Sequence, residues 1–468
     1  MKHYLGNCRR YALLLVLSIL ATMALFTTNI FSTNLSLNRL PEGRFQEIES
    51  NISKCQNPGG WQEGLVHRAR HALVAGNKPN NNISNHLILG ISSVYRKENY
   101  LQKTLSSLIQ ESNEEERRTV TIVVYLADSL PKNNLRQLEL IKESFQSHLD
   151  SGFLQVVMST ADIYPPMGFA LTKRTFNDSM QRVLWRAKQV IDFSFLFSYA
   201  QPLGDYYLVV EDDVVASEQY ITAIREFIAS RREKRWIALQ FTGFLGIGLL
   251  FRTKDLPKLN QLLWMFYQEQ PVDMLMREFI SIQIPETNVI VRRIPSLFQH
   301  IGVRSTLPNK VQRLTDNTFN MANRKFKHRV NPPADLVTSM KVYSDFFPEY
   351  AYRSTPGFFW GIAKPNDTLD IVFPSPVNIT RIVIISGIIE PKQKVKDPIK
   401  DGVVEVGSKF NKVSSNNVVY CDNFITLGKF KDGSVDYNKN IANVQCIRVR
   451  VGSAQKSWVI IREIQVFL

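Results

Sequence analysis

One short apolar stretch of the sequence runs directly into three consecutive acids. Residues 206–210 (Tyr-Tyr-Leu-Val-Val) carry no charge, and Glu211, Asp212 and Asp213 follow them immediately. A continuous apolar run of this length is typical of a strand that is covered on both faces, as in a parallel sheet. The carboxyl ends of such strands are where α/β proteins bind their ligands. The stretch therefore predicts an α/β fold with an acidic ligand site at one edge of its sheet.

Two explanations fit three neighbouring carboxylates. Packed acids repel one another unless a cation lies among them, and hard divalent ions such as Mg²⁺ or Mn²⁺ prefer carboxylate oxygens. Alternatively the acids form an ordinary turn, in which Asp213 or Ser217 caps the N-terminus of the helix that follows. The residues themselves leave both explanations open.

The sequence around the acids alternates between strand-like and helix-like segments. Apolar runs predict strands at residues 87–91, 120–126, 153–158 and 236–241. Apolar residues at helical spacing predict helices at residues 100–109, 135–145, 182–199, 218–230 and 255–267. The highly charged residues 111–118 are predicted as a loop. Strands alternating with helices are typical of βαβ units and a mostly parallel sheet.

A different pattern begins after Asn331-Pro332-Pro333. Short strand-like segments follow one another at turn spacing, which is typical of an all-β sandwich. We therefore predict an α/β domain over residues 86–335 and a β-sandwich over residues 336–468.

The N-terminal region contains an uncharged segment, residues 11–30, that is long enough to cross a bilayer. Positive charges precede it, which favours a cytoplasmic N-terminus. A cleaved signal peptide is the alternative, but its apolar region is usually shorter. We predict a cytoplasmic tail at residues 1–10, a transmembrane anchor at 11–30 and a polar stem at 31–85, with the remainder in a lumen or outside the cell.

Glycosylation sequons and cysteines fit that placement. Six asparagines lie in Asn-x-Ser/Thr sequons: Asn34, Asn51, Asn82, Asn177, Asn366 and Asn378. Cys421 and Cys446 lie in one C-terminal block and could pair in an oxidising compartment. The formal net charge of +15 would suit a nucleic acid, but the basic residues are dispersed and carry no nucleic-acid-binding motif, so we predict no such partner.

Several stretches occur in the same order as in a known family. They include residues 90–94 (Gly-Ile-Ser-Ser-Val), 125–128 (Tyr-Leu-Ala-Asp), 211–214 (Glu-Asp-Asp-Val), 265–269 (Met-Phe-Tyr-Gln-Glu), 296–300 (Ser-Leu-Phe-Gln-His) and 331–334 (Asn-Pro-Pro-Ala). Through them, residues from about 86 to 468 resemble the alpha-1,3-mannosyl-glycoprotein 4-beta-N-acetylglucosaminyltransferases, Golgi enzymes that add a branching GlcNAc to N-glycans. The likeness is greatest to the less characterised members of that family.

The resemblance implies a GT-A-type α/β catalytic domain that uses UDP-GlcNAc and a divalent cation, Mn²⁺ or Mg²⁺. It also implies a C-terminal lectin-like β-sandwich and a single-pass type II anchor in the Golgi membrane. The acceptors would be N-glycans on glycoproteins, and other Golgi transferases are possible partners.

The resemblance also assigns roles to particular residues. Glu211 and Asp213 would hold the metal, and Asp273 is the candidate general base of an inverting transfer. His300 would complete the metal site, since imidazole suits Mn²⁺-like ions, and a structural, hydrogen-bonded histidine is the alternative. An alternative for Asp273 is a carboxylate stabilised by the dipole at a helix N-terminus. The predicted donor-binding residues are Asp128, Lys188, Gln189, Asp192, Glu211 and Asp212.

In the lectin-like module the resemblance points to Asp397 as a glycan-binding residue. The neighbouring Lys396, Lys400 and Asp401 make a plain solvated loop an equal interpretation. Trp360 and Trp458 would stack on sugar or fill the core, and burial is the favoured interpretation.

Five positions depart from the family's pattern. They are Tyr95 for a lysine, Val190 for an asparagine, Gln240 for a glutamate, Leu249 for a lysine and Met274 for a tryptophan. Loss of charge and hydrogen-bond donors near a diphosphate can reduce a rate by orders of magnitude. Two functions therefore remain open. One is a GlcNAc transferase that forms a β1,4 linkage on the α1,3-mannose arm. The other is a catalytically inactive, transferase-like protein that binds glycans or regulates other N-acetylglucosaminyltransferases.

Overall fold

The computed structural model describes most of the chain beyond residue 57. The described residues are 58–77, 86–165, 175–231, 235–283, 290–304, 311, 313–316, 318–319, 329–355, 357–389, 395–413, 418–453, 455 and 458–468. The predicted anchor at residues 11–30 and the sequons at Asn34, Asn51 and Asn82 lie outside them. Within these ranges every helix is too short or too polar to cross a membrane.

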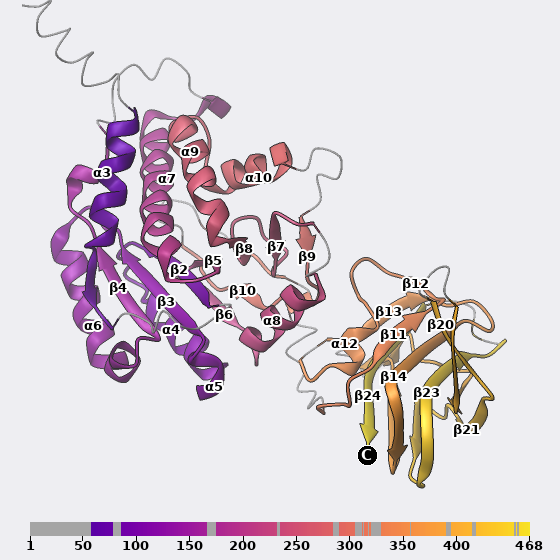
Figure 1. The fold of residues 1–468 in the computed structure, drawn as a ribbon. Coiled ribbons are helices and arrows are strands. Elements are labelled where there is room, and N and C mark those ends of the chain that lie inside the picture. Colours follow the sequence, from indigo (N-terminus) through magenta and orange to yellow (C-terminus); the bar gives the residue numbers. More distant parts are fainter. Residues whose placement is uncertain are drawn as a thin grey trace, which may run out of the picture. The chain divides into compact units, whose positions relative to one another are not determined.

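The α/β part is built on one eight-stranded sheet with the order β1-β4-β3-β2-β5-β8-β7-β9 (Figure 1). Its strands are β1 (Leu73–Ala75), β2 (Leu87–Ser93), β3 (Val120–Leu126), β4 (Leu154–Met158), β5 (Tyr206–Glu211), β7 (Ala238–Gln240), β8 (Leu249–Arg252) and β9 (Val291–Arg292). The four central strands β4-β3-β2-β5 are parallel, as the sequence predicts. Strands β1 and β8 join them in antiparallel orientation, so the whole sheet is mixed.

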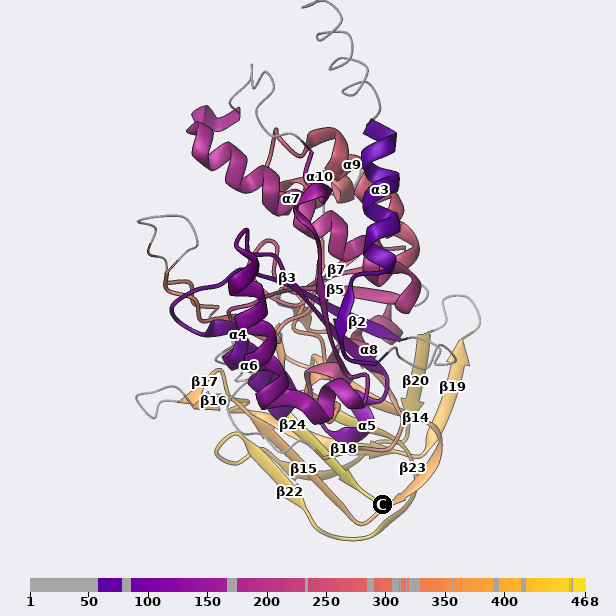
Figure 2. The ribbon, with the colours of Figure 1, turned by 90° about the vertical axis from the view of Figure 1, so that its left-hand side faces the viewer.

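Helices cover both faces of this sheet (Figures 1 and 2). They are α3 (Pro58–Arg70), α4 (Tyr100–Gln110), α5 (Glu114–Arg117), α6 (Pro131–Asp150), α7 (Met180–Ala200), α8 (Tyr220–Ser230), α9 (Leu256–Phe266) and α10 (Val272–Gln283). Successive side chains of a strand point to opposite faces. Along β3, Ile122 and Val124 therefore join one core with α4, α6 and α8. Val123 and Tyr125 join the other core with α3, α7, α9 and α10.

The charged segment at 111–118 is not a loop throughout. Residues Glu114–Arg117 form the short helix α5, which begins with a capping box. The Asn113 side chain accepts a hydrogen bond from the Glu116 amide, and the Glu116 carboxylate accepts one from the Asn113 amide. This reciprocal cap satisfies amides that a helix start otherwise leaves unpaired, which a reading of charge alone misses.

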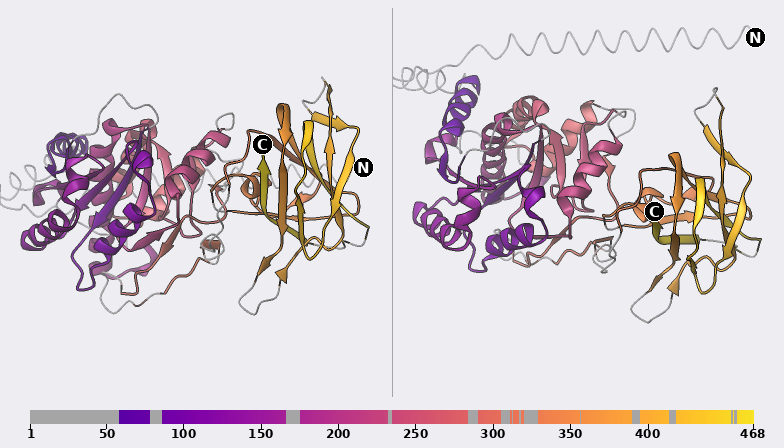
Figure 3. Two further views of the ribbon diagram at one scale, coloured as in Figure 1. Left: turned by 90° about the horizontal axis from the view of Figure 1, so that it is seen from below. Right: turned by 60° about the horizontal axis from the view of Figure 1, so that its bottom comes forward.

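The C-terminal part is β-rich, as predicted, and consists mainly of two antiparallel five-stranded sheets (Figure 3). One sheet has the order β11 (Asp335–Thr338), β14 (Thr368–Ile379), β23 (Ile441–Val451), β18 (Gly402–Gly407) and β21 (Ile425–Lys429). The other has the order β12 (Lys341–Val342), β13 (Phe359–Ile362), β24 (Trp458–Phe467), β15 (Arg381–Ser386) and β22 (Ser434–Tyr437). Alternate residues of both sheets, such as Ile371 and Ile461, share one hydrophobic core. Two hairpins, β16 (Ile388–Ile389) with β17 (Val395–Lys396) and β19 (Lys409–Val413) with β20 (Val418–Asp422), and the helix α12 (Glu349–Tyr352) complete this part.

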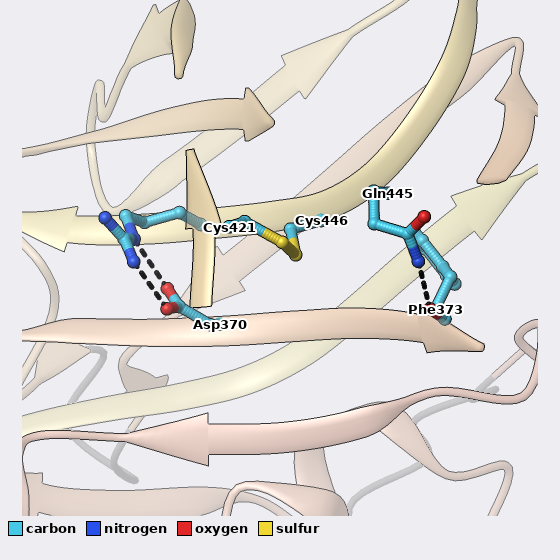
Figure 4. The surroundings of a disulfide bond; sticks show 6 residues. Asp370, Phe373, Cys421, Gln445 and Cys446 are labelled. Carbon is cyan, nitrogen blue, oxygen red and sulfur yellow. Dashed lines mark hydrogen bonds and ion pairs between the residues drawn. A yellow bond between two sulfur atoms is a disulfide. The ribbon is translucent and has the colours of Figure 1, made fainter. Parts of the chain in front are cut away.

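A disulfide joins Cys421 of β20 to Cys446 of β23 (Figure 4). Both cysteines are buried, and an ion pair between Arg448 and Asp370 lies close to them, with two nitrogen–oxygen distances of 2.7 Å. The bond links the hairpin to a central strand of the sheet and closes a loop of 25 residues.

The residue that leads into β2 is a buried histidine. The Nε2 atom of His86 lies 2.9 Å from the Thr121 hydroxyl. Burial, together with the positive charge of Arg225, lowers the pKa of His86 to about 4. The folded protein therefore binds a proton at this position more weakly than the unfolded chain does.

We expect acid to destabilise the protein partly through His86. The unfolded histidine has a pKa of about 6.5, so the stability that His86 contributes is present above that pH and is lost as the pH falls towards 4. Between pH 7 and 4.5 this loss is about 2 kcal/mol, or about 6 °C in the unfolding midpoint. His86→Gln should reduce the fall of the midpoint by that amount in thermal scans at the two pH values. The same change at the exposed His71 should have no effect, and equal falls in wild type and His86→Gln would contradict this account.

Candidate active site

The carboxyl ends of three parallel strands meet at one edge of the α/β sheet. Strand β2 lies between β3 and β5, so the strand order reverses at this point: β3 and β4 extend the sheet on one side of β2, and β5 extends it on the other. Such a switch in strand order leaves a crevice where α/β proteins bind ligands. Ser93 ends β2 and Glu211 ends β5, and Asp128 follows β3 closely.

Two acids and a histidine are grouped at the end of β5. One ligand atom each from Glu211, Asp213 and His300 lies within 4.8 Å of the other two. His300 Nε2 is 3.4 Å from Asp213 Oδ2 and 4.0 Å from Glu211 Oε2. The buried Oδ1 of Asp213 has no hydrogen-bond partner among the described residues. Carboxylate and imidazole donors with an unpaired buried oxygen fit a divalent cation such as Mn²⁺ or Mg²⁺.

Strand pairing brings His300 to the acids from far along the chain. The short strand β6 (Val214–Ala216) pairs with β10 (Phe298–His300), which places His300 opposite Val214. The amide of Ile301 donates to the Asp213 carbonyl over 2.8 Å. A side-chain carbon at Gly302 would clash with the Asp213 carboxylate, so any other residue here would force that carboxylate to move.

The acids do not cap the following helix. Helix α8 begins after Gln219, and β6 separates it from Asp213. This arrangement excludes the alternative in which Asp213 or Ser217 serves as the N-cap.

Arg96 lies against the acids, although no sequence motif singled it out. Its guanidinium forms ion pairs with Asp212 and with Asp213, the latter at 2.8 Å between Nη1 and Oδ2. The Ser93 hydroxyl donates to the other Asp212 oxygen over 2.6 Å. The available signal was topological: Arg96 follows β2, and β2 and β5 are parallel neighbours.

The cluster attracts positive charge. Burial and the negative charges of Asp213 and Asp273 raise the pKa of Glu211, although 39% of its side chain is accessible. Burial alone would raise the pKa of Asp213, but its hydrogen bond with His300 and the charge of Arg96 outweigh burial and lower it. For His300, burial is outweighed by the Asp213 hydrogen bond and the acids' charges, which raise its pKa. The raised pKa of His300 follows from the negative charge of the two acids, which a cation would neutralise.

Asp273 is close enough to this cluster to act on Glu211 by its charge. It is the second residue of α10, and its Cβ would lie 3.1 Å from a side-chain carbon placed on Gly246. Gly246 has a φ of +85°, a conformation that glycine adopts at low cost. The glycine-rich turn after β7 therefore packs directly against Asp273. The position of Asp273 at the N-terminus of α10 also agrees with the interpretation that the helix dipole stabilises its carboxylate.

The predicted donor-binding residues of α7 are engaged with protein atoms. Lys188 Nζ lies 2.8 Å from Asp192 Oδ2 and donates to the Ala127 carbonyl over 2.6 Å. The Tyr164 hydroxyl donates to Asp192 over 2.6 Å. Burial raises the pKa of Asp192 and outweighs the effect of Lys188. This pair thus holds the end of β3 in place, and the half-buried Gln189 follows Lys188 on the helix.

Asp128 ties two of the strand ends together. Its carboxylate accepts hydrogen bonds from the Tyr95 amide at 3.1 Å, the Leu130 amide at 2.8 Å and the Asn133 side chain at 3.1 Å. These contacts are typical of a turn-stabilising aspartate. The contacts of Lys188 with Ala127, of Asp128 with Tyr95 and of Arg96 with the acids thus form a row across the ends of β3, β2 and β5.

A cavity of about 230 Å³ opens beside this row. It is lined by residues 93–101, Arg136, Gln137, Leu140 and Asp212. The Arg136 guanidinium lies 5.4 Å from the centre of the Tyr95 ring, and the Arg96 guanidinium lies 5.0 Å from the centre of the Tyr100 ring. The cavity therefore combines two arginines, aromatic rings and access to Asp212.

Two of the five departures from the family's pattern are core residues in this chain. Val190 and Leu249 are buried in the core on the α7 face of the sheet. Gln240 is also buried and donates to the Phe244 carbonyl over 2.7 Å. Tyr95 and Met274 are half-buried.

In the β-rich part, Asp397 lies beside a group of aromatic rings. It has a φ of +50°, and its buried Oδ2 has no hydrogen-bond partner among the described residues. The neighbouring Lys396 ammonium lies 4.7 Å from the centre of the Trp360 ring. Trp360 and Trp458 are half-buried, with ring centres 5.5 Å apart. An unpaired carboxylate oxygen that directly follows a lysine over a tryptophan ring suits a sugar, which offers hydroxyl donors and an apolar ring face.

Three predicted glycosylation sites can be placed on the structure. Asn177, Asn366 and Asn378 are all exposed. The side-chain oxygen of Asn378 accepts a hydrogen bond from the Asn443 amide over 3.0 Å.

Taken together, the fold and the site define an α/β protein with a carboxylate–imidazole cluster at the switch point of its sheet and a β-rich C-terminal part. Residues 60–319 match the family model described as the MGAT4 conserved region, and residues 334–463 match the MGAT4 C-terminal domain. The chain belongs to the MGAT4 family, which confirms the resemblance seen in the sequence.

Curated relatives extend over most of the chain. Alpha-1,3-mannosyl-glycoprotein 4-beta-N-acetylglucosaminyltransferase C of Mus musculus is 36% identical over 388 residues, 82% of this chain and 79% of that protein. Alpha-1,6-mannosyl-glycoprotein 4-beta-N-acetylglucosaminyltransferase of Gallus gallus is 35% identical over 409 residues, 86% of this chain and 85% of that protein. A solved chitosan-binding module of a Paenibacillus chitosanase/glucanase, bound to chitotriose, is 14% identical with a TM-score of 0.23, and covers 30% of this chain and all of that one.

Proposed function

We propose that this chain is a GT-A-type glycosyltransferase that transfers GlcNAc from UDP-GlcNAc, with inversion, in β1,4 linkage to the α1,3-mannose arm of N-glycans. Its place would be the Golgi membrane, held by residues 11–30, with the catalytic part in the lumen. The observation that carries the proposal is the cluster of Glu211, Asp213 and His300 beside Asp273, in a chain whose relatives bear the name of this activity.

The cluster supports a role in donor binding. Glu211, Asp213 and His300 would hold a divalent cation, and Asp213 Oδ1 is the buried oxygen that such an ion would satisfy. With the cation bound, the site would gain a Lewis acid that stabilises the negative charge on the departing diphosphate. The adjoining cavity, with Arg96 and Arg136 in its lining, would receive part of the nucleotide.

Asp273 would supply the base that sugar transfer requires. Its carboxylate would accept the proton of the acceptor hydroxyl as that oxygen attacks the sugar carbon from the face opposite the leaving diphosphate. The negative charges at Glu211 and Asp213 favour a cation between them and the donor, which would leave Asp273 available to the acceptor. Gly246 lets the glycine-rich turn approach Asp273 closely and so restricts where its side chain can lie.

A transfer assay tests the proposal. The full-length chain in detergent is incubated with UDP-GlcNAc, Mn²⁺ and a biantennary N-glycan, and products are separated by mass and linkage. The expected product is one GlcNAc heavier, with the new β1,4 linkage on the α1,3-mannose. Because the Gallus gallus relative is named for the α1,6-mannose, products on both arms are resolved. No product with either Mn²⁺ or Mg²⁺ would overturn the proposal.

The β-rich part would bind glycans through Asp397. Replacing Asp397 by alanine should weaken the binding of a GlcNAc-terminated oligosaccharide by roughly 10-fold or more, since a hydrogen bond to a charged group contributes about 1.5–3 kcal/mol. Transfer to a short soluble acceptor should stay within about twofold of wild type. Glycan-array or titration measurements check the first effect, and the exposed Lys400→Ala serves as control. Unchanged glycan affinity in Asp397→Ala would remove this assignment.

A second function is favoured by one specific observation, the ion pairs of Arg96 with Asp212 and Asp213. A chain in which this guanidinium kept the place of the cation would be catalytically inactive and would bind glycans or regulate other N-acetylglucosaminyltransferases. Tight glycan or transferase binding without any turnover would identify that function.

A further inference from the structure

We propose that Arg96 acts as a built-in counter-ion that competes with the divalent cation for Asp213 and is released to the diphosphate of the donor when the cation binds. Cation and nucleotide would then bind cooperatively through one side chain. The inference rests on the proposed function, because it concerns how that site takes its cation and donor.

The geometry puts Arg96 and the cation in competition for the same carboxylate. Asp213 Oδ2 accepts from Arg96 Nη1 at 2.8 Å and also faces His300 Nε2 at 3.4 Å. The Arg96 side chain is 15% exposed and forms its second ion pair with Asp212. A divalent cation at either oxygen of this carboxylate would lie a few ångströms from the guanidinium, and like charges at that distance repel strongly in a partly buried site. One of the two must leave.

The surroundings offer Arg96 a second position. It belongs to the segment between β2 and α4, and residues 93–101 of that region line the cavity of about 230 Å³. A guanidinium that turned away from Asp213 would remain next to this cavity, beside the Tyr100 ring that it already contacts at 5.0 Å. The planar fork of arginine suits two oxygens of a phosphate group. Asp212 would keep the Ser93 hydrogen bond at 2.6 Å after this change.

Thermodynamic linkage between the cation and the nucleotide determines which affinities should change. If the cation releases Arg96 and the released Arg96 binds the diphosphate, each ligand raises the affinity for the other by the same factor. Couplings of this kind are typically 5–150-fold. A cation added without nucleotide must displace Arg96 and so binds weakly.

The test measures Mn²⁺ binding by the electron paramagnetic resonance of free Mn²⁺, with and without UDP, on the full-length chain in detergent. Arg96→Ala should bind Mn²⁺ alone at least about 5-fold more tightly than wild type, and UDP should enhance its Mn²⁺ affinity at least about 5-fold less than in wild type. Arg96→Gln loses the charge but retains hydrogen-bond donors, and its Mn²⁺ affinity should change in the same direction. This variant replaces Arg96→Ala in the test if the alanine variant does not fold. Lys103→Ala is the matched control, since it removes a different cation from the Tyr100 ring, 5.8 Å from its centre.

Several results would overturn the inference. Equal or weaker Mn²⁺ affinity in both Arg96 variants would show that Arg96 only orients the acids, and so would an undiminished effect of UDP. If neither wild type nor Arg96→Gln binds Mn²⁺, Arg96 is not competing with a cation.

The transfer assay reports separately on the proposed function. Turnover with unchanged Mn²⁺ binding in the variants would support the transferase function and contradict the role of Arg96. Altered Mn²⁺ binding without turnover would support the role of Arg96 and contradict the transferase function.

Discussion

Replacing Asp213 by asparagine should reduce GlcNAc transfer by at least about 100-fold, the upper end of the loss seen when only an outer partner of a metal ligand is removed. Asp213 is buried, lies between Arg96 and His300, and carries the unpaired oxygen of the cluster. Asparagine preserves the size of the side chain but removes its charge and half of its acceptor capacity. The measurement is kcat/KM for UDP-GlcNAc at saturating acceptor over a range of Mn²⁺ concentrations.

The expected loss should be only partly recovered at high Mn²⁺, and the unfolding midpoint of the variant should stay close to that of wild type. Asp205→Asn is the control, because Asp205 is exposed at the opposite end of the same strand. Activity within about twofold of wild type is expected for it, as for most surface substitutions. Full activity in Asp213→Asn would show that the acid cluster has no part in transfer.

Asp273→Asn should lower kcat by about 10²- to 10⁴-fold, the range that a general base contributes, while Mn²⁺ and UDP-GlcNAc affinities change little. A base acts on the acceptor proton during the reaction, so its loss should appear in kcat rather than in donor binding. The dipole interpretation predicts something different: a change in the stability of α10 with catalysis retained. Steady-state kinetics with donor binding measured by calorimetry separates the two.

A matched control lies on the same helix. Glu278 is exposed on α10, and Glu278→Gln removes a carboxylate from that helix without touching the acid cluster. Normal kcat in this variant and a large loss in Asp273→Asn would assign the effect to position 273. Comparable rates for Asp273→Asn and wild type would leave the general base unassigned.

The sequence identified local elements well and pairings between distant segments poorly. The run at 206–210 and its acids predicted β5 and the edge of the sheet where the cluster lies. Hydrophobic pattern cannot reveal that β8 joins β5 in antiparallel orientation, because a buried strand is apolar in either direction. The charged residues 111–118 predicted a loop, since the reciprocal Asn113–Glu116 cap depends on specific hydrogen bonds rather than on hydropathy.

The site shows the same difference between local contacts, which the sequence predicts, and contacts between distant segments, which it does not. Arg96 is 116 residues from Asp212 in the sequence, and only the parallel pairing of β2 with β5 brings them together. Lys188 and Asp192 show the reverse case: the family resemblance suggested ligand contacts, yet their i,i+4 spacing on α7 already allowed the ion pair that the structure contains. The roles of Asp128, Gln189, Asp273 and Asp397 stay predictions.

Gly302 gives the acid cluster a signature that can be read in any related sequence. Since any side chain there would displace the carboxylate of Asp213, a lineage that abandoned the cation would be free to replace this glycine, and one that still uses it would not. Comparing this single position across related sequences would therefore separate proteins that still bind the cation through the acid cluster from proteins that have lost this use.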